Sequence, residues 1–297
     1  MKITDKHAYL IMAHNDPYCF HKLISLLDDK RNDIYVHIDK KSDINLFNDV
    51  KVKYSNIYFI SNRIDVQWGS YSQIKTELTL LYTAASHRKY ARYHLLSGVD
   101  LPLKTQNEIH KFFDMYNSKE FVGYAPPRSV KDISFKTEFI HIGLRNYRSN
   151  SVVKKIFSHV VHDGFINLQK LIHYRIKHDI EIKKGANWFS ITNELVQFIL
   201  QNEDLIKKTF RYGLCIDEMF VQTLLWNSPF KDRIYSTKDE FEGCMRLIDW
   251  NRGDPWIWKD EDLETLIKSN RMFARKFSSK VDRKIIDHLC NYLLGRQ

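Results

Sequence analysis

The sequence has few cysteines and no long apolar run. Its four cysteines, Cys19, Cys215, Cys244 and Cys290, are widely spaced and form no CxxC pair. This spacing argues against a disulfide framework or a zinc site, and it predicts reduced cysteines in the core. No apolar run approaches the roughly 20 residues that cross a bilayer, and the N-terminal apolar stretch is too short for a signal peptide. These absences predict a globular protein of the cytosol.

Common phosphate-binding and metal-binding motifs are also missing. The sequence contains neither a P-loop nor a GxGxxG motif. Its short Asp-x-Asp pattern, Asp260 and Asp262, lies in a segment predicted to be helical (259–270). Carboxylates there are typical of a first helical turn and not of a metal site at a strand end. No metal-chelating carboxylate pair is therefore evident.

An excess of basic residues is the main feature of the composition. The 297 residues include 46 Lys and Arg against 36 Asp and Glu, which gives a net charge of +10. Such a charge favours an anionic partner, which could be nucleic acid, an acidic membrane surface or a phosphorylated small molecule. The basic residues form no dense tract, and there is no zinc-finger or RNP motif. We therefore expect no nucleic acid partner, and a basic nucleic-acid-binding protein remains only as an alternative.

The apolar periodicity predicts an α/β fold. Short apolar runs typical of strands occupy residues 8–14, 33–39, 56–61 and 90–97, and apolar residues recur at helical spacing over 15–29 and 70–86. This alternation predicts a mostly parallel, Rossmann-like central sheet with helices on both faces. The second half is less regular, with one or two helices over 154–177, a strand at 187–191 and helices over 193–201 and 217–227. Without an internal repeat or a linker, a single domain over 1–297 is the simplest division.

Several polar residues stand where predicted strands end. Asp39 ends the second predicted strand, and the carboxyl ends of strands in an open α/β sheet line the ligand crevice. It could accept hydrogen bonds from a nucleotide base or ribose, or it could only cap a loop. Trp68, before a helix, could stack on a base or belong to the core. Asp100 follows another apolar run that Pro102 prevents from continuing as a central strand, so this turn should also face the crevice.

Charged residues of the second half suggest chemistry. Asp217 and Glu218 begin a predicted helix, where Glu218 could act as a general base, or both could stabilise the helix start. Arg252 lies in a tryptophan-rich turn and Lys276 in the segment MFARKF. Both could neutralise a diphosphate as a metal would, or both could be solvated surface charges.

The ordered segments resemble one known family. They are AYLIMAH (8–14), VHIDKKS (36–42), R…WGSYS (63–72), LLSGVDLPLKT (95–105), GANWFSIT (185–192), IDE (216–218) and FARKF (273–277). In this order they resemble the core-2/I-branching enzyme family of glycosyltransferases, family 14, which also includes the peptide O-xylosyltransferases. The resemblance covers most of the chain. It implies a GT-A type fold and an inverting transfer from a UDP-sugar without a metal or other cofactor.

The resemblance also implies residue roles. Glu218 matches the catalytic base, and Trp188 matches an aromatic residue on the acceptor side. Donor contacts are implied for Ala13, Asp39, Trp68, Asp100, Arg252 and Lys276, with Asp39 at the uracil and the two cations at the diphosphate. Residues 1–125 would form the nucleotide-binding half, and residues 126–297 the acceptor-binding and catalytic half.

Together these observations predict an enzyme that forms a β-glycosidic bond. The expected reaction transfers N-acetylglucosamine from a UDP-sugar to a hydroxyl of an acceptor glycan, which could be lipid-linked, in surface polysaccharide biosynthesis. The expected location is the cytoplasm, and the protein could be peripheral at the inner face of the cell membrane, where the +10 charge favours anionic lipid. The alternatives are a UDP-xylose or other UDP-hexose transferase, a catalytically inactive sugar-binding homologue, and a nucleic-acid-binding protein, which would show a steep salt dependence.

Overall fold

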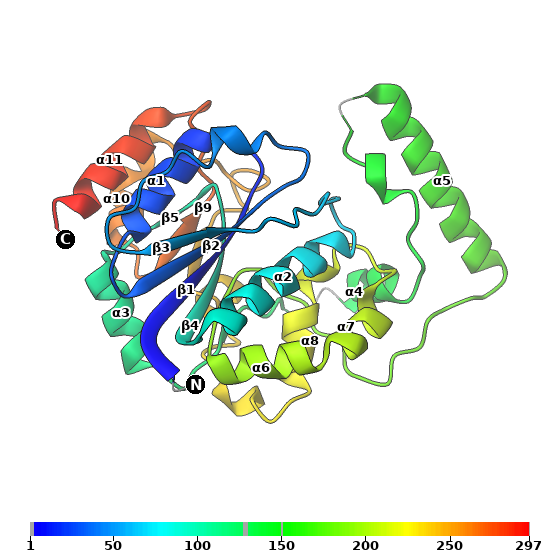
Figure 1. Ribbon diagram of the computed structural model, residues 1–297. Helices are drawn as coiled ribbons and strands as arrows, with labels where there is room; N and C mark the ends of the chain where they lie inside the picture. Colours follow the sequence, from blue (N-terminus) through cyan, green and yellow to red (C-terminus); the bar gives the residue numbers. More distant parts are fainter. Residues whose placement is uncertain (1–2, 127–129, 150, 297) are drawn as a thin grey trace.

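The computed structural model describes residues 3–126, 130–149 and 151–296, and its centre is a six-stranded sheet (Figure 1). The strand order is β3-β2-β1-β4-β7-β6. The first four strands of this order pair in parallel, whereas β7 pairs antiparallel with β4 and with β6. The strands are β1 (Ile3–Ala13), β2 (Asn32–Ile38), β3 (Asn56–Phe59), β4 (Lys89–Ser97), β6 (Phe121–Val122) and β7 (Phe189–Ile191). The predicted α/β fold with a mostly parallel sheet is confirmed.

A second, three-stranded sheet was not predicted. It has the order β5-β9-β8, with β5 (Asp100–Pro102), β8 (Arg246–Ile248) and β9 (Phe273–Arg275). The edge strand β5 runs antiparallel to β9, and its register sets Asp100 opposite Arg275. Both sheets combine strands from the first 125 residues with strands from the rest of the chain, so the two predicted halves share one folded unit.

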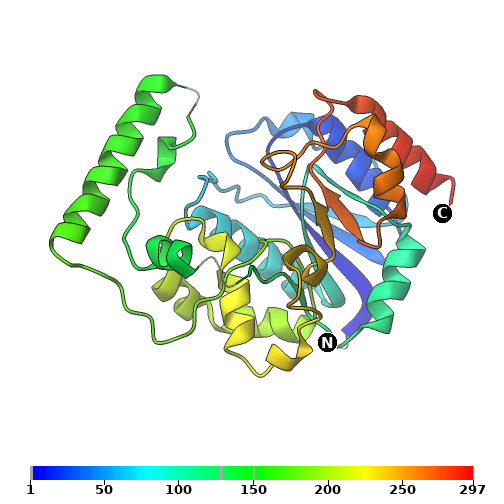
Figure 2. The same ribbon diagram turned by 180° about the vertical axis from the view of Figure 1, so that it is seen from behind.

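Helices cover both faces of the large sheet. The helices of the described residues are α1 (Pro17–Leu27), α2 (Ser72–His87), α3 (Gln106–Met115), α4 (Val130–Thr137), α5 (Val152–Leu171), α6 (Asn193–Gln201), α7 (Glu203–Phe210), α8 (Phe220–Trp226), α9 (Glu240–Gly243), α10 (Leu263–Lys268) and α11 (Arg283–Leu294). In Figures 1 and 2, α1, α10 and α11 lie on one side of the sheet, and α2, α6 and α8 lie on the other.

The period of the central strand explains this layering. In β1, Tyr9 and Ile11 pack into the core beneath α1 and α11, whereas Ala8 and Leu10 pack into the core beneath α2 and α6. Successive side chains of a strand point to opposite faces, so a strand buried on both faces reads as a continuous apolar run. All four cysteines are buried and none is in a disulfide.

Two predicted helices begin later than expected. In the segment predicted as a helix over 217–227, Ile216–Glu218 form a separate 3₁₀ turn and α8 begins only at Phe220. Met219 has a φ of −135°, far from helical values, so one helix cannot run through it. Likewise, Asp260–Asp262 form a 3₁₀ turn ahead of α10.

Helix α5 stands apart from the body of the molecule in both ribbon views (Figures 1 and 2). It is one continuous helix, Val152–Leu171, where one or two helices were predicted over 154–177, and residues 172–177 are not helical. Across the described ranges, no helix is both long and apolar enough to cross a membrane.

Candidate functional site

The carboxyl ends of β1, β2 and β4 lie together at the point where the strand order reverses direction, with β2 on one side of β1 and β4 on the other. Asp39, just after β2, donates its backbone N–H to the carbonyl of Ala13 at 2.8 Å, and Gly98, just after β4, donates to the carbonyl of Met12 at 2.9 Å. A Cβ added to Gly98 would lie 2.7 Å from the Cβ of Ala13, so only glycine allows this close approach. Ligands of open α/β sheets bind at this kind of position.

The side chain of Asp39 is held by its own loop. Its Oδ1 accepts from the backbone N of Lys41 at 2.8 Å, and its Oδ2 lies 3.1 Å from the Lys41 ammonium. Arg63 donates to the backbone carbonyl of Asp39 at 2.6 Å. The carboxylate is therefore fixed at the edge of the sheet, and a nucleotide base that binds it has to share it with Lys41.

Asp100 anchors an arginine that the sequence analysis did not single out. One Asp100 oxygen lies 2.8 Å from Nη1 of Arg275, and the other accepts from the backbone N of Ser97 at 2.8 Å. Burial raises the pKa of Asp100, and the Arg275 charge opposes this rise. The Arg275 guanidinium also lies 4.6 Å from the ring centre of buried Trp188. Asp100 and Trp188 thus both hold Arg275 in place.

Lys276 follows Arg275 and is the less constrained cation. Its ammonium has neither a hydrogen bond nor an ion pair with any residue that the structure describes. Partial burial lowers the pKa of Lys276, and the neighbouring Arg275 charge lowers it further. Its backbone is fixed, because the carbonyl of Lys276 accepts from the N of Trp258 at 3.0 Å. A half-buried, unpaired ammonium on a fixed backbone is suited to binding an anion.

Arg252 has a different environment from Lys276. It forms ion pairs with Asp249 at 2.5 Å and with Asp262 at 2.8 Å. Its guanidinium lies 5.4 Å from the ring of Trp258, so it belongs to the same neighbourhood as Lys276. The two cations that the resemblance assigns to a diphosphate are therefore unequal, because only Lys276 carries an uncompensated charge.

Glu218 lies in the 3₁₀ turn before α8, and among the described residues only one of its two carboxylate oxygens has partners. Its Oε2 lies 3.4 Å from the ammonium of Lys136 and 3.8 Å from that of Lys184. Its Oε1 has no hydrogen-bond or ion-pair partner within 3–126, 130–149 and 151–296. The side chain is 37% exposed. A general base must reach the proton that it removes, and the unpartnered oxygen can do so without breaking either lysine contact.

Two buried carboxyl groups lie behind Glu218. Asp217 does not cap α8; its Oδ2 accepts from Gln73 at 2.7 Å and from Asn187 at 3.3 Å. Burial raises the pKa of Asp217 to about 7, and the Glu218 charge adds to the rise. Glu77 of α2 is fully buried, and neither of its oxygens has a partner in the described part of the chain. Burial raises the pKa of Glu77 well above its usual value, and Asp217 adds to that rise.

Replacing Asp217 by Asn should change how stability depends on pH. The folded-state pKa of Asp217 is raised from 3.8 to about 7. Asp217 therefore makes its full contribution to the free energy of unfolding of the wild type below about pH 4, and this contribution is lost as the pH rises towards 7. The free energy of unfolding of Asp217→Asn, relative to wild type, should therefore increase over this range. The free energy of unfolding of Glu77→Gln, relative to wild type, should also increase as the pH rises.

Urea unfolding at about pH 5 and about pH 8 measures this difference. Asp204→Asn, at an exposed position of α7, is the matched control and should leave the difference independent of pH. A constant difference for Asp217→Asn as well would contradict the assignment of a buried, neutral carboxyl.

Trp68 is neither a core residue nor a free stacking surface. It is 36% exposed, so the alternative of a core tryptophan is wrong. The ring of Tyr147 stacks on it at 6.0 Å, and the Arg148 guanidinium lies 3.7 Å from its centre. The next residue, Gly69, accepts at its carbonyl from the N of Cys215 at 2.8 Å, which ties this loop to the Glu218 turn.

The structure connects the predicted residues through partners that the sequence analysis missed. Arg275, next to Lys276, lies 4.6 Å from the ring centre of Trp188, and the neighbouring Asn187 donates to Asp217 at 3.3 Å. The Lys276 and Glu218 regions are therefore linked by direct contacts and belong to one constellation. Arg275 could have been suspected from its place beside Lys276 in FARKF. Lys136 and Arg148 lie in the basic, aromatic stretch without periodicity, where no sequence signal distinguished them.

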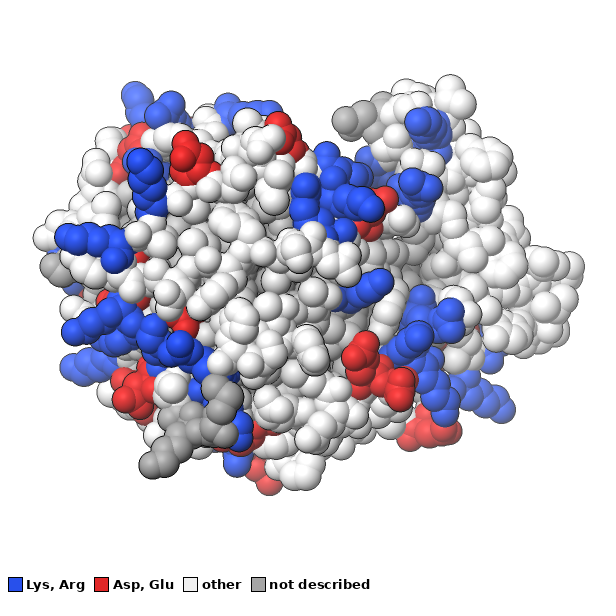
Figure 3. All heavy atoms as spheres, in the orientation of Figure 1, with Lys and Arg blue, Asp and Glu red and all other residues white. Residues whose placement is uncertain are grey.

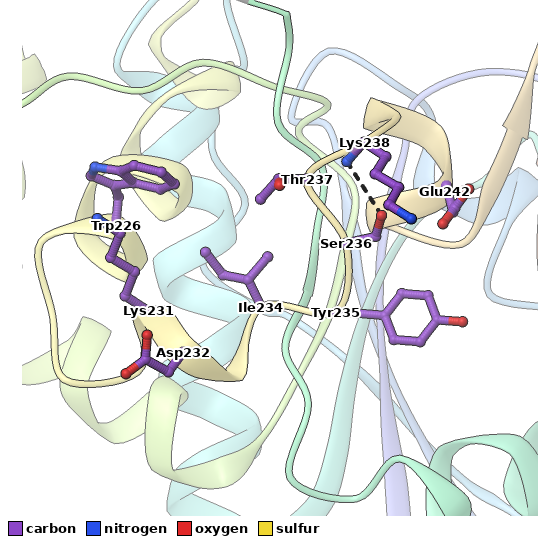
Figure 4. A pocket seen from close by; sticks show the side chains of 9 residues that line it. All are labelled: Trp226, Lys231, Asp232, Ile234, Tyr235, Ser236, Thr237, Lys238 and Glu242. Atoms are coloured by element: carbon purple, nitrogen blue, oxygen red, sulfur yellow. Dashed lines mark hydrogen bonds between the residues drawn. The ribbon is translucent and has the colours of Figure 1, made fainter.

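An open surface pocket shares none of its lining residues with this constellation (Figure 4). It is lined by Trp226, Lys231, Asp232, Ile234, Tyr235, Ser236, Thr237, Lys238 and Glu242, none of which was predicted as a site residue. The ring of Trp226 already has two ammonium groups near its centre, Lys231 at 3.8 Å and Lys183 at 4.0 Å. Because the protein's own cations already lie near this ring, the pocket does not replace the constellation around Glu218 as the candidate site.

The carboxylates of the Asp-x-Asp pattern do not form a metal site. Among the described residues, no group of three or more His, Cys, Asp or Glu side chains is placed to hold a metal ion. The Asp260–Asp262 pair is engaged elsewhere, because Asp262 binds Arg252 and Asp260 binds His288.

Comparison with known proteins gives one family and a consistent group of relatives. The family model described as Core-2/I-Branching enzyme matches residues 7–266. The chain is 23% identical to Xylosyltransferase 1 of Mus musculus over 312 residues, which covers 97% of this chain and 30% of the relative. It is 24% identical to Xylosyltransferase 2 of Rattus norvegicus over 315 residues, covering 97% and 34%. With Xylosyltransferase of Ciona intestinalis it shares 22% over 307 residues, again covering 97% and 34%. The chain thus spans about a third of the length of these relatives.

Proposed function

Because the chain belongs to the Core-2/I-Branching enzyme family of glycosyltransferases, we propose that it transfers a sugar from a UDP-sugar to a hydroxyl group of an acceptor glycan. The observation that carries this proposal is the pairing of two unused groups in one constellation. Glu218 has an oxygen without a partner among the described residues, and Lys276 is a cation without one. The first suits a base and the second suits a diphosphate.

The proposed reaction is a single displacement. The acceptor oxygen attacks the anomeric carbon of an α-linked UDP-sugar, the bond from that carbon to the phosphate oxygen breaks, and the acceptor proton goes to Oε1 of Glu218. A β-glycoside and UDP are the products. Negative charge grows on the departing diphosphate, where Lys276 stabilises it with help from Arg252. Lys136 and Lys184 hold Oε2 of Glu218 and so orient the carboxylate.

Two donor sugars have support. The sequence resemblance predicts N-acetylglucosamine, whereas the relatives described above are named xylosyltransferases, which favours xylose. We propose that one of these two sugars is the donor. The acceptor glycan is further proposed to belong to a surface polysaccharide and to be lipid-linked, at the cytoplasmic face of a membrane. The net charge of +10 supports such a location.

UDP release from purified protein tests this proposal. The donors are UDP-xylose, UDP-N-acetylglucosamine, UDP-glucose and UDP-galactose, each with and without EDTA, and slow donor hydrolysis replaces the unknown acceptor. We expect release from one donor that survives EDTA and disappears in Glu218→Gln. Loss of release with EDTA would overturn the metal-independent mechanism. A protein that neither binds nor hydrolyses any of the donors would overturn the transferase itself.

A further inference from the structure

Helix α5 buries mostly polar residues and exposes apolar ones, the reverse of an ordinary surface helix. Its buried residues are Ser158, His162, Ile166 and Gln169, which recur every three or four residues and are mostly polar. Its exposed residues include Val153 (77%), Phe157 (69%), Val160 (64%) and Leu171 (76%). At 100° per residue, this apolar row lies opposite the buried row. The apolar face therefore points away from the protein.

Specific polar contacts fix this orientation. The Gln169 side chain accepts from the backbone N of Ile140 at 2.8 Å and donates to its carbonyl at 2.9 Å. His162 forms a hydrogen bond with His141 at 2.9 Å, and the rings of His159 and Tyr147 lie 4.0 Å apart. These contacts anchor the polar side of α5, so its apolar side cannot turn inward without losing them.

The surroundings of this apolar face are strongly basic. Between residues 139 and 178 the sequence has one acidic residue, Asp163, against seven basic ones, namely Arg145, Arg148, Lys154, Lys155, Lys170, Arg175 and Lys177. Figure 3 shows few charged side chains along the outer edge of the α5 lobe, whereas Lys and Arg side chains gather where the lobe meets the body. An apolar row flanked by cations is the pattern of a helix that lies in a membrane interface.

We propose that α5 docks the protein on an anionic bilayer by inserting its outward apolar face among the lipid chains. Its exposed apolar side chains are Val152, Val153, Ile156, Phe157, Val160, Leu168 and Leu171. Lipid chains would cover these residues, and the flanking cations would meet acidic headgroups. A second copy of the chain is the other possible occupant, but it would bring two equally basic surfaces together. The charge complementarity favours the anionic membrane.

The docking would also place the candidate site near the membrane surface. Tyr147 contacts His159 of α5 on one side and Trp68 on the other, and Arg148 lies over the same Trp68 ring. A lipid-linked acceptor would then reach the site from the surface that α5 binds. This consequence rests on the proposed function, whereas the membrane contact itself does not.

Sedimentation with vesicles tests the docking without any sugar donor. Vesicles of phosphatidylglycerol mixed with phosphatidylcholine are compared with vesicles of phosphatidylcholine alone. We expect the wild type to sediment with the anionic vesicles, and Phe157→Ser/Val160→Ser/Leu171→Ser to lose about tenfold or more of its affinity because the inserted area is lost. Lys154→Glu/Lys155→Glu should also weaken binding. The matched control is Tyr54→Ser/Tyr82→Ser/Met115→Ser, at three exposed positions (58%, 68% and 66%) on the body of the protein, and it should bind like wild type.

Two further measurements separate the outcomes. Unchanged thermal unfolding of the α5 variant shows that its effect is not loss of folding, and the assay does not depend on whether the protein transfers sugar. A wild type that stays in the supernatant with anionic vesicles, or an α5 variant that binds as the wild type does, would refute the docking. A wild-type dimer in analytical ultracentrifugation that the α5 substitutions dissociate would show that a second copy occupies this face.

Discussion

Glu218→Gln should nearly abolish sugar transfer while leaving UDP binding intact. The substitution keeps the shape of the side chain but removes the basic oxygen, and loss of a positioned general base lowers turnover by about 10²–10⁴-fold. UDP affinity should not fall, because the expected diphosphate contacts come from Lys276 and Arg252. Turnover with the donor found in the panel, together with calorimetric titration of UDP, measures both quantities.

A nearby carboxylate provides the control for this variant. Glu240 lies close enough to Glu218 for the Glu218 charge to add to the rise that burial causes in the pKa of Glu240. Glu240→Gln removes an acidic group from the same region without touching the proposed base, so its turnover should remain close to that of the wild type. Normal turnover in Glu218→Gln would refute the assignment of the base.

Lys276→Met should reduce both donor affinity and turnover. Removing one preorganised group that stabilises developing charge typically lowers turnover by about 10²–10³-fold. Lys276 has no carboxylate partner in the described ranges, so the donor diphosphate would be the group that neutralises it. Steady-state kinetics with the donor, and calorimetric titration of UDP against the variant, measure the two effects.

Arg252→Met is the variant to compare with Lys276→Met. Arg252 already binds two carboxylates, Asp249 and Asp262, which compensate its charge. Its loss should therefore weaken donor binding less than the loss of Lys276 does. Lys276→Arg should restore part of the activity, since it keeps the charge but changes the reach of the group. Equal effects of Lys276→Met and Arg252→Met would contradict the unequal roles that we assign to these cations.

Much of the fold follows from local sequence patterns. The strands at 8–14, 33–39, 56–61 and 90–97 and the helix over 193–201 were predicted from apolar period alone, and all are present. Strands β1, β2 and β4 lie in the interior of the sheet and α6 packs on it, where burial enforces a regular pattern, whereas β3 is an edge strand. The small β5-β9-β8 sheet was not predicted, because strands of three residues are too short to show a period.

For the candidate site, the sequence suggested individual residues but not their partners. Asp39 became a candidate because it ends an apolar run, Glu218 because it lies in an acidic pair, and Lys276 through the resemblance of the segment FARKF. The pairing of Arg275 with Asp100 depends on the register of β5 and β9, and the lysine contacts of Glu218 come from residues 82 and 34 positions away. Such pairings depend on how distant elements pack, which no local pattern encodes.

Helix α5 shows most clearly what the sequence determines and what only the tertiary structure determines. The sequence by itself determined that most of the segment 154–177 would be helical and that it would be basic, since helical propensity and net charge are local properties; the helix ends at Leu171. It also determined the central sheet, because a strand buried on both faces must be apolar throughout. Only the tertiary structure decided which face of α5 packs. The polar contacts of His162 and Gln169 with residues 140 and 141 turn the apolar row outward. Periodicity shows that a helix has an apolar face, but only its packing partners determine whether that face meets the core, another molecule or a membrane.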